Sequence, residues 1–232
     1  MHLSNELLWL FYVVLDLSVA VILTRIFGKV GLFAVIIISS LLSNIQVTEL
    51  VTLFGFTVAI GNVTYASIFF ATDLLSELYG KNEAHKGVIL GLIAIVLMAL
   101  YMQLILQFTP APFDRMASHL HAIFSFVPRI AVGSIVAYTI SQNVDVMLFH
   151  FWKGITGEKH LWLRNNGSTM ISQFVDSAIF VFIAFYGVVP MHVFWQILFS
   201  NYILKWLIAL IDTLFVYWGV SWMKKTVQEG GN

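Results

Sequence analysis

The chain has 232 residues, of which 59% are hydrophobic, 15% aromatic and only 10% charged, and its formal net charge is +0 at pH 7. A soluble domain carries about 25% charged residues, so this composition excludes a soluble globular protein and predicts an all-α polytopic membrane protein. The absence of cysteine excludes disulfides and thiolate metal sites, and no basic run indicates nucleic-acid binding.

Apolar segments of the length that crosses a bilayer, about 20 residues, recur along the whole chain. We expect seven transmembrane helices in a single integral membrane domain, residues 1–232, with spans near 7–25, 31–43, 62–78, 87–108, 129–152, 165–187 and 193–222. The first lacks the positive start of a signal peptide and is interpreted as a retained helix.

Two connections between these spans are long enough to interpret. Residues 44–61 are too polar for lipid and rich in β-branched side chains, which predicts a short extracellular hairpin or a re-entrant segment. Residues 109–128 hold three of the four prolines together with His119 and His121. We interpret this stretch as a loop and not as a metal site.

The basic residues are distributed unevenly between the two sides of the predicted bundle. Counting connections alternately, only Arg115 and Arg129 fall on one side, and Lys205 lies inside a span. The other nine fall on the opposite side: Arg25, Lys29, Lys81, Lys86, Lys153, Lys159, Arg164, Lys224 and Lys225. The positive-inside rule then places the N-terminus outside and the C-terminus in the cytoplasm.

A five-residue pattern occurs twice, in the middle of the fifth and sixth spans. Residues 141–145 read Ser-Gln-Asn-Val-Asp, and residues 172–176 read Ser-Gln-Phe-Val-Asp. In each copy the glutamine and aspartate stand three positions apart, so an amide and a carboxyl share one helix face. A carboxylate at mid-membrane depth costs roughly 2.5–3.5 kcal/mol, so these faces need a partner or a ligand. Antiparallel helices with one motif are also what an inverted repeat gives.

Polar residues in the third and seventh spans lie at comparable depth. Asp73 and Glu77 stand four positions apart, and Asn201, Lys205 and Asp212 share one helix face. At the helical rise, Asp73, Asp212 and the repeated glutamines lie about 10–15 Å from the cytoplasmic end, so we expect one shared cavity. The candidate binding residues are Asn44, Asp73, Glu77, Gln142, Asp145, Gln173, Asp176, Asn201, Lys205 and Asp212.

Some of these acids also allow other interpretations. Glu77 precedes Lys81 and suits an acid at the membrane interface as well as a binding residue. Asp16, in the first span, is expected to face a neighbouring helix or a partner subunit. The buried polar residues could also serve only as packing contacts between helices.

The chemistry of the candidate set favours binding over catalysis. The sequence lacks a His-Glu-x-x-His motif, a Gly-x-Ser-x-Gly elbow and a phosphate-binding Gly-x-x-x-x-Gly-Lys-Ser/Thr loop, so we expect no enzyme, cofactor or metal. Carboxyls, carboxamides and one amine among aromatic residues suit a flat polar heterocycle. A guanine-like ring offers adjacent N–H donors to a carboxylate, polar edges to amides and a face for stacking.

Several motifs occur in a fixed order: residues 72–80 (Thr-Asp-Leu-Leu-Ser-Glu-Leu-Tyr-Gly), 128–131 (Pro-Arg-Ile-Ala), 137–138 (Ala-Tyr), 141–146, 172–177, 182–185 (Phe-Ile-Ala-Phe) and 202–205. With them the chain resembles the queuosine precursor transporter family, also called the vitamin uptake transporter family, over about residues 35–222. The candidates that match family motifs are Asp73, Glu77, Gln142, Asp145, Gln173, Asp176 and Lys205. The other three candidates, Asn44, Asn201 and Asp212, are selected because of their estimated depth in the membrane.

This resemblance implies a six-helix core, spans two to seven, similar to the substrate-binding subunits of energy-coupling-factor transporters, with the span at 7–25 added. It implies import of 7-cyano-7-deazaguanine or 7-aminomethyl-7-deazaguanine across the cytoplasmic membrane of a prokaryote, by a monomer or a homodimer. A proton exchanged by Asp73, Asp145 or Asp176 would couple the import. A vitamin-binding subunit that recruits an ATPase module, and a scaffold membrane protein, remain alternatives.

Overall fold

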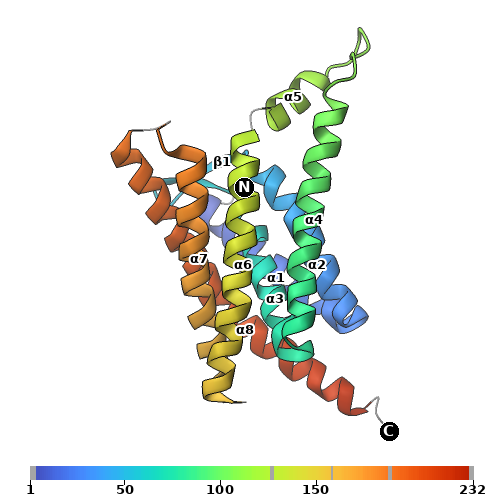
Figure 1. The fold of residues 1–232 in the computed structure, drawn as a ribbon, viewed down its shortest axis with the longest axis vertical. Coiled ribbons are helices and arrows are strands. Elements are labelled where there is room, and N and C mark those ends of the chain that lie inside the picture. The colour runs from blue at the N-terminus through green and yellow to red at the C-terminus, as the bar shows by residue number, and fades with distance from the viewer. Residues whose placement is uncertain (1–3, 126–127, 158, 188–189, 230–232) are drawn as a thin grey trace.

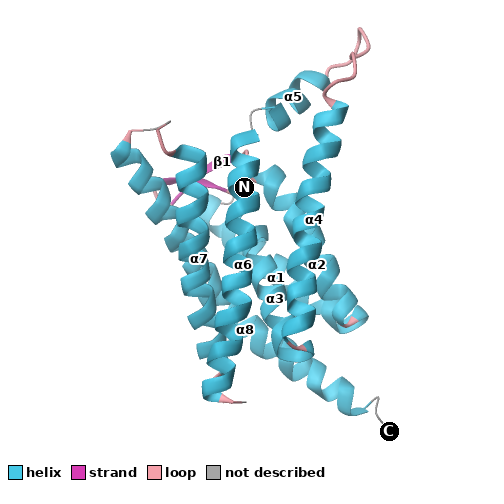
Figure 2. Ribbon diagram, viewed as in Figure 1, coloured by secondary structure: helices cyan, strands magenta, loops and turns pink. Residues whose placement is uncertain are grey.

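The computed structural model describes residues 4–125, 128–157, 159–187 and 190–229. Within them the chain forms eight helices and one two-stranded sheet (Figures 1 and 2). The elements are α1 (Asn5–Phe27), α2 (Lys29–Gln46), β1 (Leu50–Leu53), β2 (Phe56–Ala59), α3 (Asn62–Tyr79), α4 (Lys81–Ile105), α5 (Ala117–Ser125), α6 (Pro128–Thr156), α7 (Leu161–Phe185) and α8 (Met191–Glu229).

The long helices run up and down, so that the connections gather at two ends of the bundle (Figure 1). One end carries the β1–β2 hairpin, α5 and the starts of α6 and α8, and we call it the hairpin end. The other carries the connections α1–α2, α3–α4 and α6–α7, and we call it the basic end because Lys29, Lys81, Lys153 and Lys159 lie there.

A tight corner joins α1 to α2 at the basic end. Gly28 has φ +58° and donates its N–H to the carbonyl of Thr24, which closes α1. This left-handed conformation suits a residue without a Cβ atom. The helices then approach so closely that a Cβ atom on Gly31 would lie 2.2 Å from the Leu23 carbonyl oxygen. Glycine at these two positions therefore sets the path of the first helix pair.

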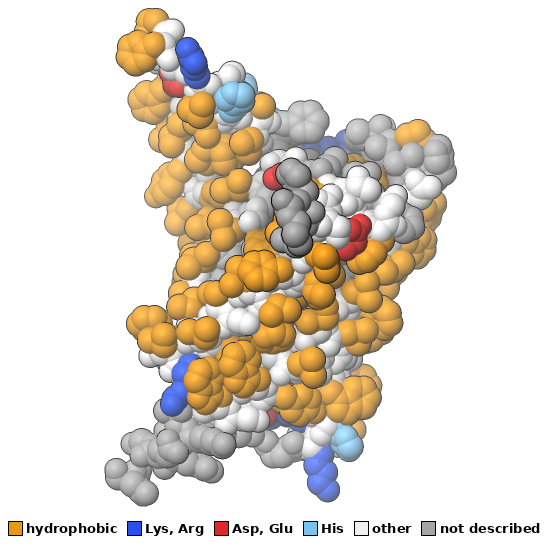
Figure 3. Space-filling model, turned by 180° about the vertical axis from the view of Figure 1, so that it is seen from behind, with side chains coloured by type: hydrophobic (Ala, Val, Ile, Leu, Met, Phe, Trp, Pro, Cys, Tyr) orange, Lys and Arg blue, Asp and Glu red, His pale blue; other side chains and the backbone are white. Residues whose placement is uncertain are grey.

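Six of the described helices, namely α1, α2, α4, α6, α7 and α8, are long and apolar enough to cross a membrane. Their outer surfaces are hydrophobic over the middle of the molecule, whereas charged side chains lie toward the two ends of the view in Figure 3. Such a belt matches the hydrocarbon layer of a bilayer. The chain is a multi-pass helical membrane protein.

The third predicted span, α3, does not meet the same criterion of apolar composition. All of its 18 residues except Tyr65, Leu78 and Tyr79 are buried, and it packs against α1, α2, α4, α6 and α8. A helix enclosed by other helices needs no lipid-facing surface and can carry polar residues inside the bundle. This position explains why α3 holds Asp73 and Glu77.

The connection between the second and third spans forms a β-hairpin and not a re-entrant segment. The strands pair antiparallel with Val51 opposite Val58, and a two-residue turn at Phe54 and Gly55 has positive φ angles. This is the turn type that matches the strand twist in short hairpins. The side chain of Asn5 donates to the carbonyl of Thr52 at 3.1 Å, which fastens the hairpin to the start of α1.

Two local expectations differ from the structure. The stretch that contains His119 and His121 forms helix α5, because the Asp114 side chain accepts hydrogen bonds from the backbone N–H groups of Met116 and Ala117 just before it. Residues 166–168 lie inside α7, which begins at Leu161 and not near residue 165. Asn166 is held there because it donates to the Trp162 carbonyl and to Thr213.

Candidate functional site

A cavity of about 1410 Å³ lies among α2, α3, α6, α7 and α8 at the hairpin end. Its exposed lining residues belong to the hairpin, α5 and the first turns of α8, so it opens at that end. Its lining also includes buried or partly buried residues inside the bundle, among them Tyr65, Ala137, Asp176, Ser177, Leu204 and Lys205. The cavity is large enough for a small organic molecule together with water.

An ion pair between Asp176 of α7 and Lys205 of α8 lines the inner part of the cavity. Lys205 Nζ donates to Asp176 Oδ2, while Asp176 Oδ1 accepts from the hydroxyl groups of Tyr65 at 2.5 Å and Ser141 at 3.0 Å. Lys205 Nζ also lies 4.6 Å from the centre of the Tyr65 ring. A buried pair is stable when further hydrogen bonds complete it, as they do here.

Side-chain amides line the wall of the cavity next to this pair. Asn62 Nδ2 donates to Asn201 Oδ1 at 3.2 Å, which links the start of α3 to α8. Asn44 Nδ2 donates to the Ser40 carbonyl at 2.8 Å. Each carboxamide keeps further donor or acceptor capacity that a ligand can use.

Aromatic side chains complete the walls and make much of the surface flat and apolar. Tyr65, Phe180, Phe185, Trp195 and Phe199 all line the cavity. Such rings offer stacking faces to a planar ligand, while the ion pair and amides offer directional hydrogen bonds. The site therefore suits a flat molecule with several polar atoms on its edge.

The two copies of the repeated pattern contact each other reciprocally across α6 and α7. Ser141 of the first copy donates to Asp176 of the second at 3.0 Å, and Ser172 of the second donates to Asp145 of the first at 2.7 Å. The copies differ in their other partners, because Asp176 pairs with Lys205 and Asp145 does not. The repeat thus forms a local two-fold arrangement with one neutralised and one unneutralised carboxyl.

Asp145 belongs to a second group of buried acids, with Asp73 of α3 and Asp212 of α8. Ser172 donates to Asp145, Thr169 donates to Asp73 at 3.3 Å, and Asn165 donates to Asp212 at 2.8 Å. No lysine, arginine or histidine in the described part of the chain forms an ion pair with any of these acids. We call these three carboxyls the acid cluster.

Within the acid cluster, Asp73 Oδ1 and Asp145 Oδ2 are buried and have no hydrogen-bond partner among the described residues. A carboxylate that is buried without a basic partner is costly in the membrane interior. The side chains of all three acids are buried inside the bundle. The acid cluster therefore comprises three buried carboxyls on α3, α6 and α8 that lack a basic partner among the described residues.

The structure divides the ten candidate residues among different places. Asn44, Asp176, Asn201 and Lys205 line the cavity, and Asp73, Asp145 and Asp212 form the acid cluster. Gln142 accepts from Thr72 at 3.2 Å, and Gln173 is buried, but neither lines the cavity. Glu77 lies apart from all of these, paired with Arg164 and Lys153 at the basic end.

Three residues of the site, Asn62, Tyr65 and Ser141, were not among the candidates predicted from the sequence, and the surroundings of Asp16 had two possible interpretations. Tyr65 and Asn62 stand on α3, and Tyr65 precedes Asp73 by eight positions, which places both on one helix face. Ser141 is part of the repeat, but only its glutamine and aspartate were selected. Asp16 accepts a hydrogen bond from Ser67 of α3, so it faces a neighbouring helix.

The bundle of apolar helices, with an internal cavity lined by an ion pair, defines a multi-pass membrane protein with an enclosed polar cavity. The model of a family described as "Putative vitamin uptake transporter" matches residues 59–219. This match covers the acid cluster and most of the cavity. No solved structure gives a significant match.

Three curated relatives agree with this family. A "Probable queuosine precursor transporter" of Bacillus subtilis (strain 168) is 40% identical over 214 residues, which cover 92% of this chain and 93% of the relative. A protein of the same name from Haemophilus influenzae is 30% identical over 70% of this chain and 67% of its own length. The "Queuosine precursor transporter" of Escherichia coli (strain K12) is 28% identical, with 67% of each chain covered. The chain belongs to the queuosine precursor transporter family.

Proposed function

We propose that this protein imports 7-deazaguanine precursors of queuosine, 7-cyano-7-deazaguanine or 7-aminomethyl-7-deazaguanine, and that they bind in the cavity at the hairpin end. The observation that carries the proposal is the buried Asp176–Lys205 pair beside the amides of Asn62 and Asn201. The names of the family relatives support the substrate class.

The edge of a deazaguanine ring is complementary to these groups. Its adjacent N–H donors form a fork that a carboxylate such as Asp176 accepts, and its carbonyl oxygen accepts from an amide or from Lys205. The ring face stacks on an aromatic side chain such as Tyr65. Because Asp176 already accepts from Lys205, Tyr65 and Ser141, substrate binding exchanges one of these donors for a donor of the ring.

The proposal includes seven spans, with α3 as the central one, in the cytoplasmic membrane of a prokaryote. Support comes from the burial of α3 on all sides and from its polar residues, which face protein and not lipid. Lysines gather at the connections of the basic end, which we assign to the cytoplasm. Lys224 and Lys225, which also favour this orientation, have side chains outside the described residues.

The proposal also states that import is coupled to proton movement through the acid cluster. Three buried carboxyls without a basic partner would carry charge in the membrane interior, so protonation is the way to neutralise them. Asp176 differs, because Lys205 neutralises it. We therefore assign the exchanged proton to Asp73, Asp145 and Asp212 and the substrate to Asp176.

Thermal unfolding of the purified protein in detergent tests the substrate class. A ligand that binds only the folded state stabilises it by about 2.7 kcal/mol at 100 times its Kd. We expect 7-cyano-7-deazaguanine and 7-aminomethyl-7-deazaguanine to raise the Tm, guanine to raise it less and biotin to leave it unchanged. A shift with biotin alone, or none with either deazaguanine at millimolar concentration, would contradict the proposal.

A further inference from the structure

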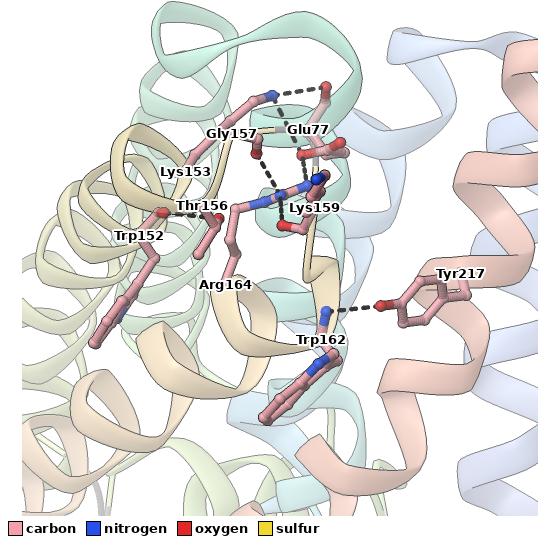
Figure 4. A network of polar contacts seen from close by, with 9 residues as sticks. All are labelled: Glu77, Trp152, Lys153, Thr156, Gly157, Lys159, Trp162, Arg164 and Tyr217. Atoms are coloured by element: carbon pink, nitrogen blue, oxygen red, sulfur yellow. Dashed lines mark hydrogen bonds and ion pairs between the residues drawn. The ribbon is translucent and has the colours of Figure 1, made fainter.

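A network of ion pairs lies at the basic end of the bundle (Figure 4), whereas the cavity lies at the hairpin end. Glu77 Oε2 of α3 lies 2.8 Å from Arg164 Nη2 of α7 and 3.2 Å from Lys153 Nζ of α6. Arg164 Nη1 donates to the carbonyls of Gly157 and Lys159 at 2.8 and 2.9 Å. Three helices and one connection therefore meet at a single carboxylate.

The central pair of this network is almost completely shielded from solvent. The side chains of Arg164 and Glu77 are 1% and 2% exposed, whereas that of Lys153 is 26% exposed. Removing one partner of a buried pair is strongly destabilising, because the other charge stays behind unpaired. The contact is strong while water is kept out, and it weakens when water enters.

One face of α7 carries polar residues from this network to the cavity. Arg164, Asn165, Thr169, Ser172 and Asp176 follow one another at helical spacing, and all are buried. The distance along α7 from Arg164 to Asp176 is about 18 Å at 1.5 Å per residue. The polar face thus joins the ion-pair network, the acid cluster and the cavity floor.

Several buried polar atoms along this face have no hydrogen-bond partner among the described residues. They include Asn165 Oδ1, Gln173 Oε1 and Ser177 Oγ. Buried groups of this kind are rare in a purely structural core, where nearly all polar atoms are paired. They are what a substrate or water would meet if it moved from the cavity toward the basic end.

We propose that Glu77, Lys153 and Arg164 form the inner gate of the transport pathway, closed in this structure while the cavity is open at the hairpin end. This inference rests on the proposed transport function. The gate opens when water and substrate reach the Glu77 carboxylate and separate it from Arg164. Glu77, selected from the sequence as a binding residue, then acts in access and not in the cavity.

The hydrogen bonds of Arg164 define which parts separate. Arg164 is held by Gly157 and Lys159 in the connection between α6 and α7, so it moves together with these two helices. Glu77 stands on α3, which packs more extensively against each of α1, α2, α4 and α8 than against α6. Opening therefore moves the basic ends of α6 and α7 away from α3.

Cysteine labelling tests the gate, because the chain has no cysteine of its own. Ser168→Cys introduces a thiol on α7, one turn from Arg164, where the serine is fully buried and donates to the Asn165 carbonyl of its own helix. In inside-out membrane vesicles, a membrane-impermeant maleimide should label this thiol slowly. Adding Glu77→Gln should raise the labelling rate at least tenfold, because the amide cannot pair with Arg164 and Lys153.

Glu83→Gln is the matched control, since Glu83 also pairs with two lysines at the basic end but near the surface. It should leave the labelling rate unchanged. An equal rise with Glu83→Gln, or no rise in a folded Glu77→Gln protein, would overturn the gate. If Glu77→Gln does not fold, Lys153→Met is the second test: it removes one of the two cations that pair with Glu77, so it should still raise the labelling rate, though less than Glu77→Gln, and no rise would overturn the gate. The labelling experiment uses no substrate and therefore tests only the gate. A failure of the proposed substrate class would instead appear as the absence of a Tm rise with the deazaguanines.

Discussion

Asp176→Asn is expected to abolish deazaguanine binding and uptake. The amide cannot accept two ring donors as a carboxylate does, and losing two hydrogen bonds to a charged group costs about 3 kcal/mol or more, roughly 100-fold in affinity. The change also leaves Lys205 without its anionic partner in a buried place. The ligand-induced rise in Tm and the uptake of labelled 7-cyano-7-deazaguanine into cells measure the effect.

Two variants separate this loss of binding from a loss of folding. Asp176→Asn combined with Lys205→Met removes both charges, so the cavity stays neutral and the protein should fold but still not bind. Asp114→Asn makes the same chemical change in the exposed segment before α5 and should bind like the unchanged protein. Full binding by a folded Asp176→Asn protein would show that the substrate binds elsewhere.

Asp73→Asn and Asp145→Asn are expected to separate accumulation from exchange. Asparagine resembles a protonated aspartate in shape and charge but cannot release a proton. In proteoliposomes with an inward-directed proton gradient, both variants should lose concentrative uptake at least tenfold. Both should still exchange external for internal substrate, since neither residue lines the cavity.

The third carboxyl of the acid cluster, Asp212, provides a further variant for the same measurement. The carboxyl of Asp212 on α8 faces Asp73 and Asp145, while Asn165, Thr169 and Ser172 of α7 are neutral donors. Asp212→Asn should therefore weaken accumulation as well. Concentrative uptake that follows the proton gradient in all three variants would remove the acid cluster from the coupling mechanism.

The sequence predicted the helical membrane class and the family because both depend on local patterns. Apolar segments of bilayer length and the ordered motifs are each contained in a short stretch of sequence, so they can be identified without knowing how the helices pack. The same approach selected α3 as a span from its boundaries, although its composition is less apolar than that of its neighbours. Its polar residues made sense only once the structure placed it in the middle of the bundle.

The division of the candidate residues could not be predicted from depth along the helices. Depth fixes how far a residue lies from the membrane surface, but contact also depends on the direction in which each helix face points. Asp145 and Asp176 carry the same motif, yet only Asp176 meets a lysine. The reciprocal bonds of Ser141 and Ser172 required the relative register of α6 and α7, which no single segment encodes.

Transport by the purified chain alone tests the central claim most directly. Proteoliposomes that contain only this protein are loaded with unlabelled 7-cyano-7-deazaguanine and placed in a trace of the labelled compound. The proposed transport function predicts that label enters and transiently accumulates, that biotin-loaded vesicles show no such accumulation, and that Asp176→Asn abolishes the signal. Label uptake no greater than in protein-free liposomes, by a protein whose Tm still rises with the substrate, would contradict it and indicate a binding subunit that needs a partner.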